Sequence, residues 1–165
     1  MPPKDERYAM ASLFGAQRQQ IAEHTPHCAR LGMEVVHLAP REATVRLPYR
    51  PELVGDPARG VVFGGVITTL LDHASGLAVF CSLPEFKAIA TLDLRIDYLR
   101  AAEPGCDLVG RVECYKLGAQ GAFVRGAAWD RSPDDPFASL LATMMVGANP
   151  SESPMARALR TQAGS

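Results

Sequence analysis

The most unusual acidic residue of this chain is Asp72, which lies in an apolar run over residues 64–81 that contains no Lys or Arg. An ionised carboxylate in such a segment is costly unless it is paired, hydrogen-bonded or hydrated. A carboxylate kept there is a candidate general base or nucleophile for hydrolysis. A purely structural role is the alternative, with Asp72 accepting hydrogen bonds from Thr68, Thr69 or Ser75 or pairing with an Arg of another strand.

A second chemical group precedes this acid by eight residues. Gly64 and Gly65 stand where the apolar run would begin as a helix, so their amide N–H groups have no carbonyl four residues earlier to bond. Such amides lie at the positive end of the helix dipole and can hold an oxyanion. The same glycines also suit a plain sharp turn, and it is their combination with Asp72 that favours a functional site.

Other catalytic arrangements are absent from the sequence. It contains no Gly-x-Ser-x-Gly nucleophile turn. The four histidines, His24, His27, His37 and His73, form no HExxH or i, i+4 pair, and His73 is interpreted as a packed or dimer-facing residue. The cysteines, which are Cys28, Cys81, Cys106 and Cys114, form no CxxC pair. We therefore expect no metal and no cofactor, and reduced thiols.

The elements that must position Asp72 are a helix and a strand. The run after Gly64 is apolar at helical spacing on nearly every side, which predicts a buried helix that ends near Pro84. Residues 88–99 then alternate strictly, which predicts a strand. One face of that strand would carry Ala90, Leu92, Leu94, Ile96 and Tyr98, and the other Thr91, Asp93, Arg95 and Asp97.

The rest of the chain supplies more strands. Helical spacing predicts one or two short helices over residues 7–24, which Thr25-Pro26 would end. Prolines and glycines predict an irregular loop over residues 50–62. Strands are predicted at residues 32–39 and 42–49, as a hairpin, and at 107–116, 122–130 and 137–147, which with 88–99 would form a four-stranded meander.

One apolar helix among six antiparallel strands can bury its surface in the concave face of a curved sheet. We therefore predict an α+β hotdog fold, in which a six-stranded antiparallel sheet wraps around one long buried helix. The predicted division is an N-terminal helical segment at 1–30, the hotdog domain at 31–148, and a mobile tail at 149–165.

Composition narrows the partners. The chain has 165 residues, of which 47% are hydrophobic, and its 17 basic and 18 acidic residues give a net charge of −1. No charged block suggests nucleic acid or anionic lipid, so a small-molecule substrate is expected. Neither a signal peptide nor a membrane span is recognisable, which predicts a cytoplasmic protein without membrane contact.

Two stretches carry a family resemblance. The sequence GGVITTLLD at 64–72, followed by ATLDLRIDYLRAA at 90–102, resembles the PaaI-like branch of hotdog thioesterases. The similarity covers roughly residues 31–147. It implies that Gly64 donates to the oxyanion, that Asp72 acts as base or nucleophile, and that Thr91 helps to orient the water.

One position departs from the family pattern, because Phe63 stands where these relatives have His before the two glycines. In relatives an Asn of the preceding loop also polarises the thioester carbonyl, and the nearest residue here is Asp56. We therefore assign Phe63, Gly65 and Asp56 to the substrate-binding surface.

The spacing of the two chemical groups has a geometrical consequence. Eight residues of helix at 1.5 Å each separate Gly64 from Asp72 by about 12 Å, so one copy cannot bring both to one carbonyl. A two-fold dimer with antiparallel helices can, which predicts sites at the subunit interface of a homodimer. We further expect these dimers to assemble to a homotetramer.

The predicted function is hydrolysis of a small or medium acyl-CoA or aryl-acyl-CoA to the free acid and CoA. The alternative is a hotdog protein that binds acyl-CoA or another acyl ligand without turnover, which the Phe63 substitution motivates. A dehydratase is disfavoured, because that chemistry pairs a His with a carboxylate. Arginines and lysines near the pocket mouth would hold the CoA phosphates, and the candidates are Arg59, Arg95, Arg100, Lys116 and Arg125.

Overall fold

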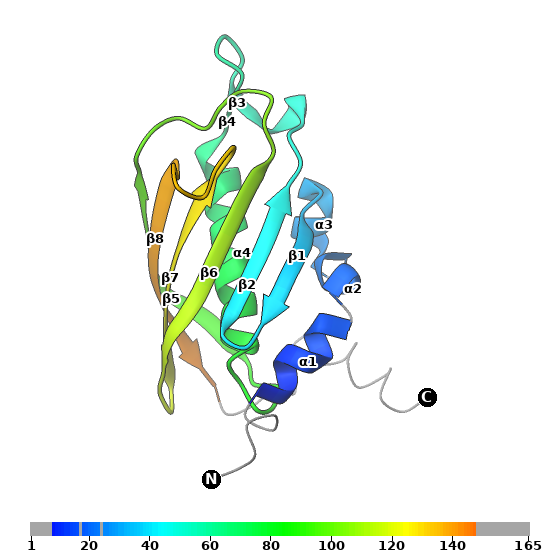
Figure 1. Ribbon diagram of the computed structural model, residues 1–165, viewed down its shortest axis with the longest axis vertical. Coiled ribbons are helices and arrows are strands. Elements are labelled where there is room, and N and C mark those ends of the chain that lie inside the picture. The colour runs from blue at the N-terminus through cyan, green and yellow to red at the C-terminus, as the bar shows by residue number, and fades with distance from the viewer. Residues whose placement is uncertain (1–7, 17, 24, 148–165) are drawn as a thin grey trace.

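A six-stranded antiparallel sheet packs on one side of a long helix, α4 (Gly64–Phe80), in the computed structural model, which describes residues 8–16, 18–23 and 25–147 (Figure 1). The sheet strands are β1 (Glu34–Ala39), β2 (Glu42–Leu47), β5 (Ile89–Tyr98), β6 (Leu108–Leu117), β7 (Gly121–Trp129) and β8 (Ala138–Val146). The predicted hotdog fold is confirmed.

The core lies between α4 and the sheet. Leu70, Leu71, Ala74 and Ala78 of the helix are completely buried, and α4 packs mainly against β2, β6 and β7. Apolar burial of this kind is the main force that holds a helix on a sheet. The predicted buried helix therefore lies where the periodicity requires it.

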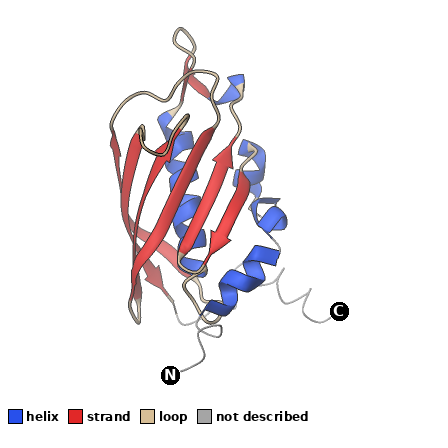
Figure 2. Ribbon diagram, viewed as in Figure 1, coloured by secondary structure: helices blue, strands red, loops and turns tan. Residues whose placement is uncertain are grey.

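Three helices are described before the sheet, and two of them lie within residues 7–24, where one or two were predicted. They are α1 (Ala9–Ala16), α2 (Arg18–Glu23) and α3 (Pro26–Leu31), and they lie along the β1 side of the sheet (Figure 2). Thr25, which is extended, separates α3 from the helical segment over residues 7–24, as predicted, but no helix was predicted after it. Proline fits the first turn of a helix, where its missing N–H has no partner to lose, so Pro26 starts α3.

The segment over residues 50–62 is more regular than predicted. It contains a 3-10 turn at Pro51–Leu53 and a two-stranded ribbon of β3 (Val54–Asp56) and β4 (Val61–Val62). The prolines and glycines predicted a loop with no regular element, yet they allow short elements to form between them. The ribbon ends directly before α4 and so fixes where that helix begins.

The strand order is β1-β2-β6-β7-β8-β5, so the predicted four-stranded meander is wrong. Of its four strands, β6, β7 and β8 follow one another as neighbours, and β5 lies beyond β8 at the edge of the sheet. The chain enters β5 from α4, on the far side of the meander, and returns to β6 by a connection that crosses the end of the sheet (Figure 1).

The edge strand β5 contains a β-bulge at Leu92. Thr91 pairs with Met144 and Asp93 with Thr143, so Leu92 has no partner of its own on β8. A bulge shifts the alternation of the side chains by one residue. Ile89 and Thr91 consequently share the inner face with Leu94, Ile96 and Tyr98, which corrects the predicted division of this strand into faces.

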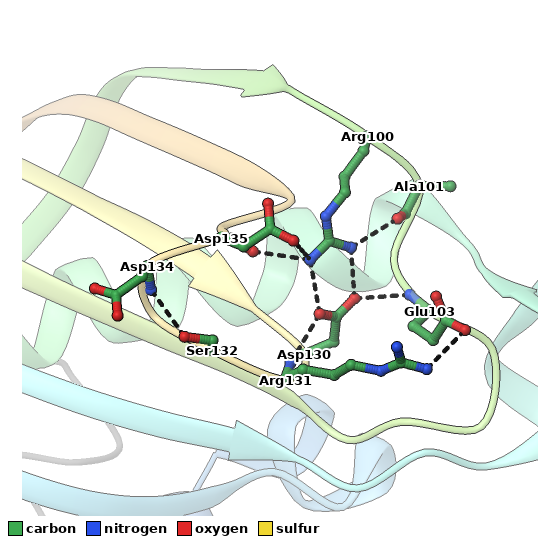
Figure 3. Close-up of polar contacts among 8 residues, drawn as sticks. All are labelled: Arg100, Ala101, Glu103, Asp130, Arg131, Ser132, Asp134 and Asp135. Carbon is green, nitrogen blue, oxygen red and sulfur yellow. Dashed lines mark hydrogen bonds and ion pairs between the residues drawn. The ribbon is translucent and has the colours of Figure 1, made fainter.

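An ion pair fixes the connection that follows β5 (Figure 3). Arg100 donates to the two carboxylate oxygens of Asp130 at 2.7 and 2.8 Å. The same carboxylate accepts the backbone N–H groups of Glu103 at 2.7 Å and Arg131 at 2.8 Å. The end of β5 is therefore tied to the end of β7, two strands away.

Candidate active site

Asp72 has one hydrogen-bond donor among the described residues, and that donor is Thr91. The Thr91 hydroxyl donates to Asp72 Oδ1 at 2.7 Å. The helix α4 positions the acid, and the bulge of β5 turns the threonine toward it. The structure thus brings together two of the three residues that the sequence predicts as catalytic.

The local structural explanation of Asp72 is wrong. The hydroxyls of Thr68, Thr69 and Ser75 donate to the carbonyls of Gly64, Gly65 and Leu71, at 3.1, 3.0 and 2.7 Å. No salt bridge involves Asp72 in the part of the chain that the structure describes. Its carboxylate therefore keeps free acceptor positions.

A cavity of about 190 Å³ opens beside this pair of residues. Its polar wall is formed by Asp72, His73 and Thr91, and the remaining wall is mostly apolar, with Leu77, Phe80, Ile89 and Met144. The apolar wall was not predicted from the sequence. Ile89 and Met144 come together only through the pairing of β5 with β8, so no local pattern marks them.

His73 borders the same cavity in its neutral form. Burial lowers its pKa from 6.5 to about 4, and the nearby charge of Asp72 offsets only part of that effect. Its Nε2 atom is buried and has no hydrogen-bond partner in the described part of the chain. His73 therefore adds no positive charge beside the acid near neutral pH, in agreement with its interpretation as a packed residue.

Gly64 and Gly65 are the first two residues of α4, as predicted. Phe63 precedes them in an extended conformation and supplies no side-chain cap. A Cβ atom at Gly65 would lie 2.6 Å from the Phe63 ring, so any side chain there would force the ring to move. The Tyr98 hydroxyl donates to the Gly64 carbonyl oxygen at 3.1 Å, a contact that no sequence pattern indicated.

The structure places the other predicted substrate-binding residues at the same end of α4. The Phe63 side chain is 61% exposed beside the helix start. Asp56 lies in the β3–β4 ribbon, where its carboxylate accepts the N–H of Ala58 at 3.1 Å and pairs with Arg59 at 4.0 Å. The polar contacts of Asp56 within the described chain thus belong to the ribbon, and none joins it to Asp72.

Most of the basic residues considered for CoA have acidic partners. Arg59, Arg95, Arg100 and Arg125 pair with Asp56, Asp97, Asp130 and Glu113 respectively. Arg100 is the most fully engaged, because it also contacts Asp135. We therefore remove Arg100 from the phosphate-binding candidates.

Among the described residues, no group of three or more His, Cys, Asp or Glu could hold a metal ion. No described helix has the length and apolar character needed to cross a bilayer.

Comparison with known proteins gives a consistent match. The family model of the thioesterase superfamily matches residues 59–136. The medium/long-chain acyl-CoA thioesterase YigI of Escherichia coli K12 is 34% identical over 95 residues, and the match covers 50% of this chain and 61% of that protein. The chain thus spans less than two thirds of this curated relative.

Solved structures extend the match over most of the chain. A crystal structure of a Pseudomonas aeruginosa protein is 39% identical, with a TM-score of 0.72, and covers 80% of this chain and 98% of its own. A mutant of the phenylacetic acid degradation protein PaaI from Thermus thermophilus is 28% identical, with a TM-score of 0.64, over 73% and 97% of the two chains. The predicted PaaI-like resemblance is confirmed.

Proposed function

Because this chain belongs to the thioesterase superfamily, we propose that it hydrolyses acyl-CoA thioesters to the free acid and CoA. The observation that carries the proposal is the 2.7 Å hydrogen bond from Thr91 to Asp72 at the edge of a mostly apolar cavity. This contact orients the carboxylate and leaves most of its acceptor positions open toward the cavity.

In the proposed reaction Asp72 takes a proton from a water molecule that attacks the thioester carbonyl, or it attacks that carbonyl directly and forms a mixed anhydride that water then hydrolyses to the free acid. Thr91 holds the carboxylate, and its hydroxyl also lies close enough to help place the water. The Gly64 amide stabilises the negative charge that develops on the carbonyl oxygen. The CoA thiolate is a weak base, so it leaves without a strong general acid.

The proposed site needs two subunits. Gly64 and Asp72 are eight residues apart in one helix, which separates them by about 12 Å. One edge of β5 has no neighbouring strand in the described chain. Leu92 of this strand and Leu99, the residue directly after it, are 64% and 59% exposed. An open edge with exposed apolar side chains favours pairing with a second copy. We therefore propose a homodimer with shared sites, and a homotetramer built from two such dimers.

The cavity supports a small or medium acyl group as the substrate. An apolar cavity of about 150 Å³ holds one benzene molecule, so about 190 Å³ admits an aryl-acyl group or a chain of similar size. The wall extends along α4 from Asp72 to Phe80, roughly 12 Å at 1.5 Å per residue. The similarity to a medium/long-chain thioesterase agrees with an aliphatic acyl chain.

The test is thiol release from a series of aliphatic and aryl-acyl-CoA thioesters. We expect turnover by the wild type and a loss of at least about a hundredfold in kcat for Asp72→Asn, since the amide can neither take a proton nor attack. Asp134→Asn is the matched control, because Asp134 is exposed in the turn before β8. Tight acyl-CoA binding without thiol release by the wild type would instead identify a non-catalytic binding protein.

A further inference from the structure

Tyr98, the last residue of β5, makes a contact that the proposed reaction leaves unexplained. Its hydroxyl donates to the carbonyl oxygen of Gly64, the first residue of α4, at 3.1 Å. We propose that Tyr98 is a positioning residue, which holds the Gly64–Gly65 peptide so that the Gly65 N–H serves as a second donor to the oxyanion. This inference rests on the proposed thioesterase function.

The chemistry follows from the planarity of the peptide unit. The Gly64 carbonyl and the Gly65 N–H belong to one rigid plane, so fixing the carbonyl oxygen also fixes the direction of the N–H. Hydrogen bonds to a carbonyl polarise the peptide and strengthen its N–H as a donor. The Thr68 hydroxyl reaches the same oxygen at 3.1 Å, so two side-chain hydroxyls converge on it.

Tyr98 holds this peptide from outside α4, whereas Thr68 belongs to the helix itself. Two successive glycines have wide conformational freedom, and Phe63 gives no side-chain cap that would restrict them. A Cβ atom at Gly64 would lie 3.3 Å from the Tyr98 hydroxyl oxygen, so that hydroxyl closely borders the peptide. Tyr98 therefore acts on the orientation of the amides, while Asp72 takes its hydrogen bond from Thr91.

Tyr98 is itself held from two sides. It pairs with Ala138 of β8 at the end of the ladder, and the next residue donates its N–H to the Phe137 carbonyl at 2.8 Å. Arg100, two residues after Tyr98, is fixed by the buried carboxylate of Asp130 (Figure 3). The backbone that carries the Tyr98 ring is thus held by β8 and by the ion pair at the end of β7.

The experiment is the substitution Tyr98→Phe, which removes the hydroxyl and keeps the ring. We expect kcat for acyl-CoA hydrolysis to fall about tenfold, the effect of losing one hydrogen bond at the transition state, while KM and the melting temperature stay within error. The affinity for a thioether analogue of acyl-CoA, which lacks the carbonyl oxygen, should also be unchanged. Tyr115→Phe is the matched control, because Tyr115 is an exposed tyrosine on β6 away from α4.

The outcomes are separable. An active wild type and a Tyr98→Phe variant with full kcat would overturn the positioning role. A variant that loses melting temperature or thioether affinity by the same proportion as kcat would also overturn it, in favour of a structural role. A wild type that releases no thiol from any acyl-CoA would overturn the proposed function, and with it this inference.

Discussion

Two carboxylates in this molecule have opposite surroundings. Asp130 has a completely buried side chain and accepts hydrogen bonds from Arg100, from the backbone of Glu103 and from the backbone of Arg131. Within the described chain Asp72 accepts one hydrogen bond, from Thr91, and it borders a cavity. Both acids belong to one sheet-and-helix domain, yet Asp72 alone of the two has acceptor positions left.

The difference shows how the fold separates a structural acid from an available one. The guanidinium of Arg100 and the two backbone N–H groups hold the pKa of Asp130 well below its usual range, so its charge is permanent near neutral pH. A carboxylate offers about four acceptor positions, and Asp130 uses all of them. Asp72 uses one and retains the others for water or a substrate.

The largest expected effect is the recovery of activity in mixed dimers, which tests whether Asp72 acts together with Gly64 of a second subunit. Gly64→Pro removes the amide N–H while proline suits the first helical position, and Asp72→Asn removes the carboxylate. Each variant alone should be nearly inactive. Coexpressed chains should regain about a quarter of the wild-type thiol release, because half of the dimers are mixed and each has one intact site. Equal inactivity of the mixture would contradict a shared site.

The second effect separates the two acids by stability. Asp130→Asn should lower the melting temperature by several degrees, because it removes the charge that compensates Arg100 and places an amide against the guanidinium. Differential scanning calorimetry measures this change. Asp135→Asn, at a largely exposed partner of the same arginine, is the control and should change little. An Asp130→Asn variant with an unchanged melting temperature would contradict the structural role of Asp130.

The third effect concerns the hydroxyl that donates to Asp72. Thr91→Val keeps the shape of the side chain and removes the hydroxyl, so we expect kcat to fall about tenfold with an unchanged melting temperature. Steady-state kinetics on the best acyl-CoA of the series gives the value. Thr143→Val, on the neighbouring strand β8, provides a control of the same chemistry. An unaltered kcat in Thr91→Val would remove Thr91 from the proposed site.

The smallest expected effect is the shape of acid unfolding. The folded-state pKa of His73 is lowered from 6.5 to about 4. The free energy of unfolding therefore falls as the pH drops from about 6.5 to 4, because the unfolded chain takes up this proton more readily than the folded one. The pKa of Asp130 is lowered too, so its stabilisation is complete above about pH 4 and is lost below it. Urea unfolding between pH 7 and 3 should show both losses in the wild type.

In Asp130→Asn only the loss of stability caused by His73 between about pH 6.5 and 4 should remain, because asparagine does not titrate. The free energy of unfolding of this variant should therefore depend less on pH below 4 than that of the wild type. If the free energy of unfolding falls equally in the two proteins below pH 4, Asp130 is not the cause of that loss.

The parts of this protein that depend on local spacing could be predicted from its sequence. Apolar periodicity located α4, alternation located the sheet strands, and the unusual position of Asp72 in a helix without cations marked it as a candidate. These signals are local because side-chain direction repeats every 3.6 residues in a helix and every 2 in a strand. The family resemblance added Thr91 to the site.

Which residues meet depends on the three-dimensional arrangement of the strands. Strict alternation placed Thr91 on the face opposite Leu94, and the bulge at Leu92, which exists only through pairing with β8, turned it to Asp72. The edge position of β5 beside β8 and the contact of Tyr98 with Gly64, 34 residues away, likewise join segments that are far apart in the chain. Such contacts depend on strand order and register, which no single stretch of sequence encodes.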